Sequence, residues 1–74
     1  SISEVEVPAS FIGKTIKELN IRAEFGVDVL SIKRQGRSEP EVSVFPGPDF
    51  KLEENDLLTI AGEIKRINVV KGLD

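Results

Sequence analysis

Residues 12–34, IGKTIKELNIRAEFGVDVLSIKR, contain a short helical pattern, a second helical turn and a strand pattern in direct succession. Three apolar residues recur at i, i+4 and i+7, a spacing that places them on one face of a helix: Ile12, Ile16 and Leu19. Thr15 and Glu18 have the Thr-x-x-Glu spacing of a capping box, in which each side chain satisfies the other's backbone N–H. We therefore expect a short helix that begins near Thr15.

A second helical turn and a strand follow within the same stretch. Asn20 is a suitable N-cap for a turn over residues 21–25, and Gly26 suits a left-handed end to that turn. Residues 27–34, VDVLSIKR, read as a strand. Their apolar side chains occur at both odd and even positions, so we expect partial cover on both faces of this strand.

The flanking residues predict three more strands and a last helix. Residues 4–7 alternate polar and apolar, as a half-buried strand does, and residues 41–45, EVSVF, read as the returning strand of a hairpin. Residues 57–61 form the most apolar run, which predicts a central strand. Residues 63–71 have helical spacing, although their β-branched INVV leaves an extended end as an alternative. The sequence thus predicts a small single α+β domain, in the order strand, helix, helical turn, β hairpin, strand, helix, with a mostly antiparallel sheet.

Gly13-Lys14-Thr15 matches the end of the phosphate-binding loop of many nucleotide hydrolases. That loop needs a further glycine five residues before the Gly-Lys pair, where its backbone N–H groups wrap around a phosphate. Pro8 occupies this position and has no N–H to donate. The sequence therefore does not predict a nucleotide-hydrolysing site, and the capping box gives Thr15 a sufficient role.

Composition excludes several classes of function. The chain has 74 residues, 10 basic and 13 acidic side chains, and no cysteine, histidine or tyrosine, which leaves few groups for proton transfer at neutral pH. We expect no enzyme, no cofactor and no metal site. A net charge of −3 and the absence of exposed stacking tryptophan or tyrosine argue against nucleic-acid binding. A core this small without disulfides favours self-association.

Two charged clusters have ordinary structural interpretations. Five carboxylates could suggest a metal site or an acid pair, but they lie at turns and strand ends without the spacing of a calcium loop, so we predict solvated charge: Asp28, Asp49, Glu53, Glu54 and Asp56. Lys33, Arg34 and Arg37 are the densest basic group. We predict a solvated strand end for them, with anion contact as the alternative.

Joined together, these pieces resemble a known family. The ordered set Gly-Lys-Thr-x-x-Glu-Leu, Ile-Arg, Phe-Gly-Val, Ile-Lys-Arg, Pro-x-Pro and Asp-x-Leu before a strand looks like the TrkA-C domain, also called the RCK C-terminal domain, over residues 1–74. The resemblance implies a cytoplasmic regulatory domain that forms homodimers. It also implies a preceding Rossmann-type RCK N-terminal domain and a potassium channel or transporter membrane subunit, which would hold the protein at the inner face of the plasma membrane.

The same resemblance implies a ligand site. Some members bind cyclic di-AMP across the dimer dyad, so this chain is either a ligand-sensing module or a purely structural association module. By similarity, the site would be lined by six residues: Ile21, Arg22, Asp28, Val29, Arg37 and Pro46. Arg22 and the N–H groups at a helix start would face phosphate, and apolar side chains would cover adenine. Asp28 would repel the anion unless Arg22 or Lys33 neutralises it.

Overall fold

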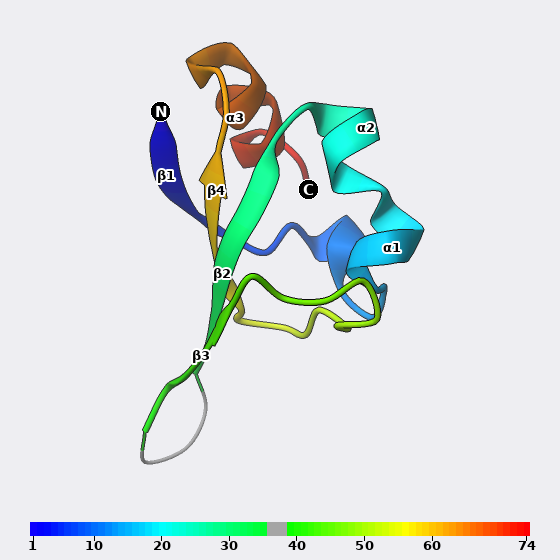
Figure 1. Cartoon of the computed structure of the whole chain (residues 1–74), viewed down its shortest axis with the longest axis vertical. Coiled ribbons are helices and arrows are strands. Elements are labelled where there is room, and N and C mark those ends of the chain that lie inside the picture. Colours follow the sequence, from blue (N-terminus) through cyan, green and yellow to red (C-terminus); the bar gives the residue numbers. More distant parts are fainter. Residues whose placement is uncertain (36–38) are drawn as a thin grey trace.

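Helices and strands follow one another in the order expected from the sequence (Figure 1). The computed structural model describes residues 1–35 and 39–74. Its elements are β1 (Ile2–Glu6), the 3₁₀ helix η1 (Ala9–Phe11), α1 (Ile16–Leu19), α2 (Ile21–Phe25), β2 (Asp28–Arg34), β3 (Glu41–Val44), β4 (Leu57–Ala61) and α3 (Ile64–Lys71). The α+β class and the antiparallel sheet are confirmed, and the last helix stays helical through its β-branched residues.

The predicted capping box is present at the start of α1. The Thr15 backbone N–H donates to Glu18 Oε1 at 3.0 Å, and the Glu18 backbone N–H donates to Thr15 Oγ1 at 3.1 Å. These bonds lower the pKa of the Glu18 carboxyl, chiefly through the Thr15 backbone N–H. Gly26 ends α2 with φ 71°, as expected for a left-handed helix end.

The predicted role of Asn20 as a side-chain cap is wrong. Asn20 adopts φ 48° and ψ 48°, and its side chain makes no capping hydrogen bond to α2. Its backbone N–H instead bonds to the carbonyls of Ile16 and Lys17, so that it ends α1 before the chain turns into α2. Asparagine tolerates this left-handed conformation better than most residues, which explains its place at the junction of two short helices.

The four strands form one antiparallel sheet in the order β1-β4-β2-β3. The register between β2 and β4 shifts at Leu30, since Val29 pairs with Ile60 whereas Ser31 pairs with Thr59. This bulge corrects the expectation that Val29 and Ile32 lie on opposite faces of β2, while Ser31 and Lys33 on the other face are half-buried, in line with the partial cover expected there. Apolar residues at odd positions before the bulge and at even positions after it point to the same side.

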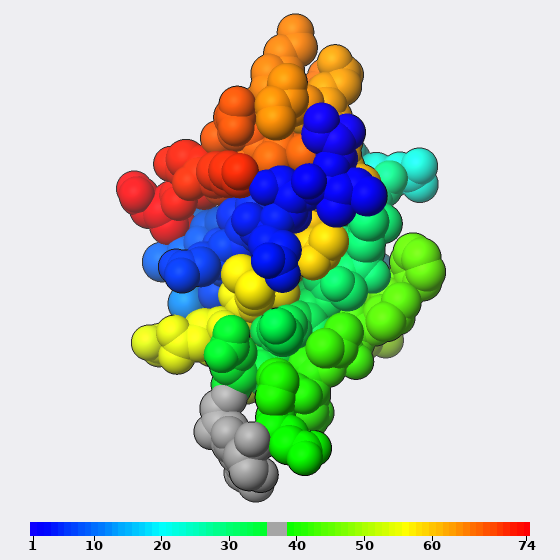
Figure 2. Space-filling view, turned by 90° about the vertical axis from the view of Figure 1, so that its left-hand side faces the viewer, coloured from blue at the N-terminus to red at the C-terminus, as the bar shows by residue number. Residues whose placement is uncertain are grey.

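One face of the sheet is covered by the helices. The core contains ten buried apolar residues, drawn from β1, β2, β4, the helices and the connecting loops: Val5, Phe11, Ile21, Val27, Ile32, Leu52, Leu58, Ile60, Ile67 and Val70. α1 and α2 lie on one side of the sheet in Figure 1, and Figure 2 shows the opposite face, with β1 in blue, β4 in yellow and β2 and β3 in green. This opposite face is called the open face below.

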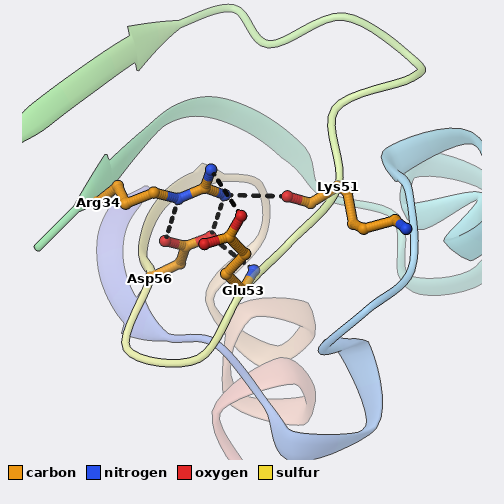
Figure 3. A network of polar contacts seen from close by, with 4 residues as sticks. All are labelled: Arg34, Lys51, Glu53 and Asp56. Carbon is orange, nitrogen blue, oxygen red and sulfur yellow. Dashed lines mark hydrogen bonds and ion pairs between the residues drawn. The ribbon is translucent and has the colours of Figure 1, made fainter. Parts of the chain in front are cut away.

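A buried ion pair joins the end of β2 to the turn before β4 (Figure 3). Asp56 is fully buried, and its carboxylate accepts from Arg34 Nε at 3.0 Å, from Arg34 Nη2 at 2.9 Å and from the Glu53 backbone N–H at 2.9 Å. Arg34 also donates to the Lys51 carbonyl at 2.9 Å and lies 4.8 Å from the centre of the Phe50 ring.

The ion pair overturns the two predictions of solvated charge for these residues. Burial would raise the pKa of Asp56, but the hydrogen bonds from Arg34 and Glu53, together with the charge of Arg34, outweigh burial and lower it. The bond to Asp56 in turn raises the pKa of Arg34. Arg34 follows the bulge at an even position, so it lies on the same side of the sheet as Ile32, and its side chain remains 30% exposed.

Candidate functional site

A hollow lies between the two short helices, the start of β2 and the loop after β3. Its volume is about 290 Å³. Ten residues line it: Ile16, Lys17, Asn20, Ile21, Arg22, Val27, Asp28, Val29, Pro46 and Pro48. This group is called the helix–loop hollow below. It combines apolar walls with two cationic side chains and one carboxylate.

Five of the six residues predicted for a ligand site line the helix–loop hollow. They come from three separate segments, which the fold brings together: Ile21, Arg22, Asp28, Val29 and Pro46. The sixth, Arg37, lies outside the described residues. Ile21 is buried in the core, and Val29 and Pro46 are half-buried, so the apolar walls are held by the packing of the fold.

Arg22 and Asp28 form an ion pair at the edge of the hollow. Arg22 Nε lies 3.2 Å from Asp28 Oδ1, and the two side chains are 85% and 51% exposed. Of the two cations expected to offset the Asp28 charge, Arg22 is the one in contact with it. Lys33 pairs with Leu57 on the open face of the sheet, away from the hollow. A pair this exposed contributes little to stability, so Arg22 can exchange partners at small cost.

Several residues of the hollow were not predicted as site residues. Lys17 adds a second cation from α1, and its backbone N–H donates to the Pro48 carbonyl at 2.9 Å, which ties the loop to the helix. Pro48 appeared in the sequence analysis only in the Pro-x-Pro motif of the family resemblance, and Ile16 only as part of an apolar helix face. Nothing in the spacing of Lys17 distinguishes it from any other exposed helix lysine.

The expected contact between the N–H groups at the start of α2 and a phosphate stays a prediction, and α2 is too short to make a strong anion site by itself. The helix has five residues and Asn20 does not cap it through its side chain. Too few peptide dipoles align in such a helix to give a strong field at its first turn. Attraction of an anion to this hollow therefore depends on the guanidinium of Arg22 and the ammonium of Lys17.

Two larger hollows, of about 470 Å³ each, lie elsewhere. The first has two carboxylates, Glu6 and Glu54, and no basic side chain among its lining residues. The second places Lys14 beside Glu18 and Glu24. Neither offers an excess of positive charge, so size alone does not make them better anion sites than the helix–loop hollow.

Within residues 1–35 and 39–74, the acidic side chains form no cluster that could hold a metal ion. In the same part of the chain, every helix is too short or too polar to cross a bilayer.

Two proteins of Bacillus subtilis (strain 168) are similar to this chain. The K(+)/H(+) antiporter subunit KhtT is 38% identical over 64 residues, which cover 86% of this chain and 37% of that protein. The Ktr system potassium uptake protein A is 34% identical over 67 residues, which cover 90% of this chain and 28% of that protein. The chain therefore spans well under half the length of either relative.

Solved structures share both the fold and part of the sequence. The RCK C domain of the potassium transport protein KtrA, in complex with cyclic di-AMP, matches with a TM-score of 0.81 and 30% identity, over 96% of this chain and 79% of that one. The RCK_C domain dimer of S. agalactiae BusR, also in complex with cyclic di-AMP, matches with a TM-score of 0.78 and 26% identity, over 92% of this chain and 87% of that one.

A third match concerns nucleic acid. S. agalactiae BusR in complex with its busAB-promotor DNA matches with a TM-score of 0.78 and 26% identity, over 99% of this chain but only 36% of that one.

The family assignment follows from the fold and from a match over nearly the whole chain. The sheet order, the two short helices joined at Asn20 and the loop closed by Pro46 and Pro48 are all present in one domain. The profile of the TrkA-C domain family matches residues 2–73. The chain belongs to the TrkA-C domain family.

Proposed function

We propose that this chain is the ligand-sensing and dimerisation module of a protein that regulates a potassium channel or transporter. In this proposal two copies bind one cyclic di-AMP at their dyad. The single observation that carries it is the helix–loop hollow, which unites five residues expected for the site from three separate segments. The cyclic di-AMP complexes of two proteins with the same fold support the choice of ligand.

The size of the hollow suits half of such a ligand. Pockets for drug-sized molecules usually have roughly 300 to 1,000 Å³, and the hollow has about 290 Å³. Cyclic di-AMP is two-fold symmetric and carries two phosphates. Two hollows related by a dyad would each take one adenosine and face one phosphate, so one ligand would satisfy two copies.

The charges of the hollow also suit one phosphate per copy. Each copy contributes two cations, Arg22 and Lys17, and one carboxylate, Asp28. The excess is one positive charge per copy, which balances one phosphate of the ligand. Arg22 would leave Asp28 to donate to phosphate, while Ile21, Val29 and Pro46 would cover the base.

The ion pair of Arg22 with Asp28 favours one alternative. A cation already paired at 3.2 Å needs no ligand, so the domain could be a structural association module that binds no small molecule.

The remaining partners belong to the whole protein. We expect a preceding Rossmann-type RCK domain, a membrane subunit and a cytoplasmic location, with no nucleic acid bound by this domain itself; the DNA complex of BusR involves a protein of which this chain matches about a third.

Calorimetry with cyclic di-AMP tests the proposal. We expect one ligand per two chains, and a rise in stability of about 2.7 kcal/mol at 100 times the dissociation constant. Arg22→Ala should weaken binding by roughly 1.5–3 kcal/mol, the scale of a hydrogen bond to a charged group. Asp28→Asn should strengthen binding, because it frees Arg22 and removes a repelling charge.

Lys65→Ala is the matched control, since it removes an exposed cation from α3 that does not line the hollow. It should leave affinity nearly unchanged. No heat and no shift in melting temperature at several hundred micromolar ligand would favour the structural module instead. Equal losses in Arg22→Ala and Lys65→Ala would show that only net charge matters and would place the ligand elsewhere.

A further inference from the structure

Residues 46–53, which follow β3, pair with the start of α1 and are called the 46–53 segment below. Backbone hydrogen bonds join the two: Gly13 N–H to the Leu52 carbonyl at 2.8 Å, Leu52 N–H to the Lys14 carbonyl at 2.9 Å, Ile16 N–H to the Phe50 carbonyl at 3.0 Å and Lys17 N–H to the Pro48 carbonyl at 2.9 Å. The first N–H groups of a helix have no partner within the helix. The 46–53 segment therefore supplies acceptors on which the first turn of α1 depends.

Several lining residues of the helix–loop hollow depend on this pairing. Pro46 and Pro48 belong to the 46–53 segment itself, and Ile16 and Lys17 belong to the first turn of α1. The bond from the Lys17 N–H to the Pro48 carbonyl joins the two groups directly. Any contact that fixes the 46–53 segment therefore also fixes the position of these four lining residues.

The Lys51 carbonyl is the point at which Arg34 reaches the 46–53 segment (Figure 3). Lys51 pairs with Thr15, and the hydrogen bonds of this pairing are made by the residues on either side of the two. In such a pair the carbonyl points away from the partner strand. The Lys51 carbonyl accepts from Arg34 Nη2 at 2.9 Å, so Arg34 holds the segment from the side opposite α1.

Further contacts of Arg34 involve the same segment. Its guanidinium lies 4.8 Å from the centre of the Phe50 ring, and Nη1 lies 3.2 Å from Glu53 Oε2. Asp56 accepts two hydrogen bonds from Arg34 and one from the Glu53 N–H. Two parallel bonds to a carboxylate fix the plane of a guanidinium. A lysine in place of Arg34 would keep the charge but could not make this set of bonds.

Both ends of the 46–53 segment are tied to β2. Directly before the segment, the Phe45 N–H donates to the Leu30 carbonyl at 2.7 Å, and near the other end Arg34 makes the contacts described above. β2 also carries Asp28 and Val29, which line the hollow. One strand thus supplies part of the wall of the hollow and anchors the segment that forms another part.

We propose that Arg34 is a positioning residue of the ligand site. It does not line the helix–loop hollow, but with Asp56 it fixes the 46–53 segment, so that Lys17, Pro46 and Pro48 hold their positions before a ligand arrives. A site ordered before binding loses less conformational entropy on binding, so affinity depends on Arg34 although Arg34 does not touch the ligand. This inference rests on the proposed function, which makes the hollow a ligand site.

The charges of Arg34 and Asp56 separate positioning from electrostatics. Asp56→Asn removes a negative charge, so electrostatics alone would tighten the binding of an anionic ligand. Positioning predicts weaker binding, because the variant no longer holds Arg34 through a carboxylate. Arg34→Lys keeps the charge, so electrostatics predicts no change in affinity, whereas positioning again predicts weaker binding.

Calorimetric titration of the 74-residue chain with cyclic di-AMP tests the inference with three variants. We expect Asp56→Asn and Arg34→Lys each to raise the dissociation constant roughly tenfold, the lower end of the effect of residues that orient metal ligands. Val5→Ala is the matched control, because it opens a cavity in the core from β1, at the sheet edge opposite β3, and Val5 does not line the hollow. It should leave the dissociation constant nearly unchanged.

The titrations are made at a temperature at which thermal melting shows the variants folded, so a loss of stability alone does not change the affinity. Asp56→Asn carries the test by itself if Arg34→Lys does not fold.

Amide hydrogen exchange without ligand tests the same role independently of binding. The N–H groups of Ile16 and Lys17 are bonded to the 46–53 segment, so release of the segment speeds their exchange. We expect the Arg34 and Asp56 variants to accelerate exchange at these two amides by roughly tenfold more than at amides in the centre of β4, as expected of a local opening. Val5→Ala should not produce this difference.

Three results would overturn the positioning role: tighter or unchanged binding in Asp56→Asn, an equal loss of affinity in Val5→Ala, or equal acceleration of exchange throughout the chain. A wild-type chain that binds no cyclic di-AMP would contradict the proposed function instead. Selective acceleration at Ile16 and Lys17 would then still show that Arg34 holds the walls of the hollow in place.

Discussion

Substitutions of Arg34 and of Asp56 should destabilise the domain by unequal amounts, and this difference tests the contribution of their ion pair to the free energy of unfolding. Arg34→Met removes the cation and leaves a fully buried carboxylate with one remaining backbone N–H donor, from Glu53. Removing one partner of a buried pair usually costs about 3–5 kcal/mol. The contact with Phe50 at 4.8 Å adds about 0.5–1 kcal/mol.

Asp56→Asn should cost less. Arg34 is 30% exposed, so its guanidinium can take water in place of the lost carboxylate, and the asparagine oxygen can still accept one hydrogen bond. We expect a loss of about 2–3 kcal/mol, the scale of hydrogen bonds to a charged group. A chain of 74 residues has a free energy of unfolding of roughly 4–11 kcal/mol. The Asp56→Asn variant should therefore remain folded, while the cost of Arg34→Met approaches the whole free energy of unfolding.

Urea unfolding at one fixed protein concentration measures the loss of stability in both variants. The same measurement at decreasing pH shows in which direction ionisation of Asp56 changes the stability. The pKa of Asp56 in the folded state lies below its ordinary value of 3.8, so its ionised form stabilises the fold at neutral pH. This contribution is complete above about pH 5, shrinks as the pH falls through 3.8, and is lost below the pKa of the folded state. Asp56→Asn should remove this part of the acid sensitivity.

Asp49→Asn makes the same chemical change at an exposed position of the neighbouring loop and should stay within about 0.5 kcal/mol of the wild type. The double variant Arg34→Met, Asp56→Asn should cost less than the two single costs together, because no unpaired buried charge remains. The reasoning is refuted if Asp56→Asn costs as much as Arg34→Met, or if the wild type and Asp56→Asn lose stability equally between pH 5 and pH 3.

Two further substitutions test the interpretation of the helical region. Lys14→Ala should leave the free energy of unfolding within about 0.5 kcal/mol, because Lys14 is exposed, and neither form should hydrolyse ATP or GTP in a phosphate-release assay; magnesium-dependent turnover lost in the variant would contradict this. Gly26→Ala should cost about 1–2 kcal/mol through its φ of 71°. Adding Arg66→Ala should not restore that loss in urea unfolding, because the 2.6 Å approach to Arg66 Cδ involves a side chain that can move away.

Local sequence signals predicted the elements of the fold because each signal acts over a few residues. The Thr15 and Glu18 capping box, the left-handed Gly26 and the apolar run of β4 all depend on neighbours in the chain. The site residues were named from resemblance to a family rather than from local chemistry. Five of them lie together because packing of the helices against β2 brings distant segments into contact.

The predictions that were wrong concern residues whose environment is set by tertiary packing. Nothing local distinguishes Leu30 as the extra residue of a bulge, yet that one residue puts Arg34 on the inner side of the sheet. Asp56 lies in a turn, where carboxylates are usually solvated. It is buried because Arg34 reaches it from a strand 22 positions earlier in the chain. The positions of charged residues in the sequence do not reveal an ion-pair partner at that separation.

Lys17 was not predicted as a site residue, yet it changes the net charge of the candidate site. With Arg22 and Asp28 alone, the candidate site would be neutral and would have little attraction for phosphate. The loop after β3 bonds to the Lys17 backbone through the Pro48 carbonyl, and this contact puts the lysine on the same hollow as Arg22. Each copy then offers one excess positive charge, and two copies offer the charge of the two phosphates of a cyclic dinucleotide. The electrostatic case for a shared ligand thus depends on a backbone contact between α1 and the proline loop, and it requires both copies.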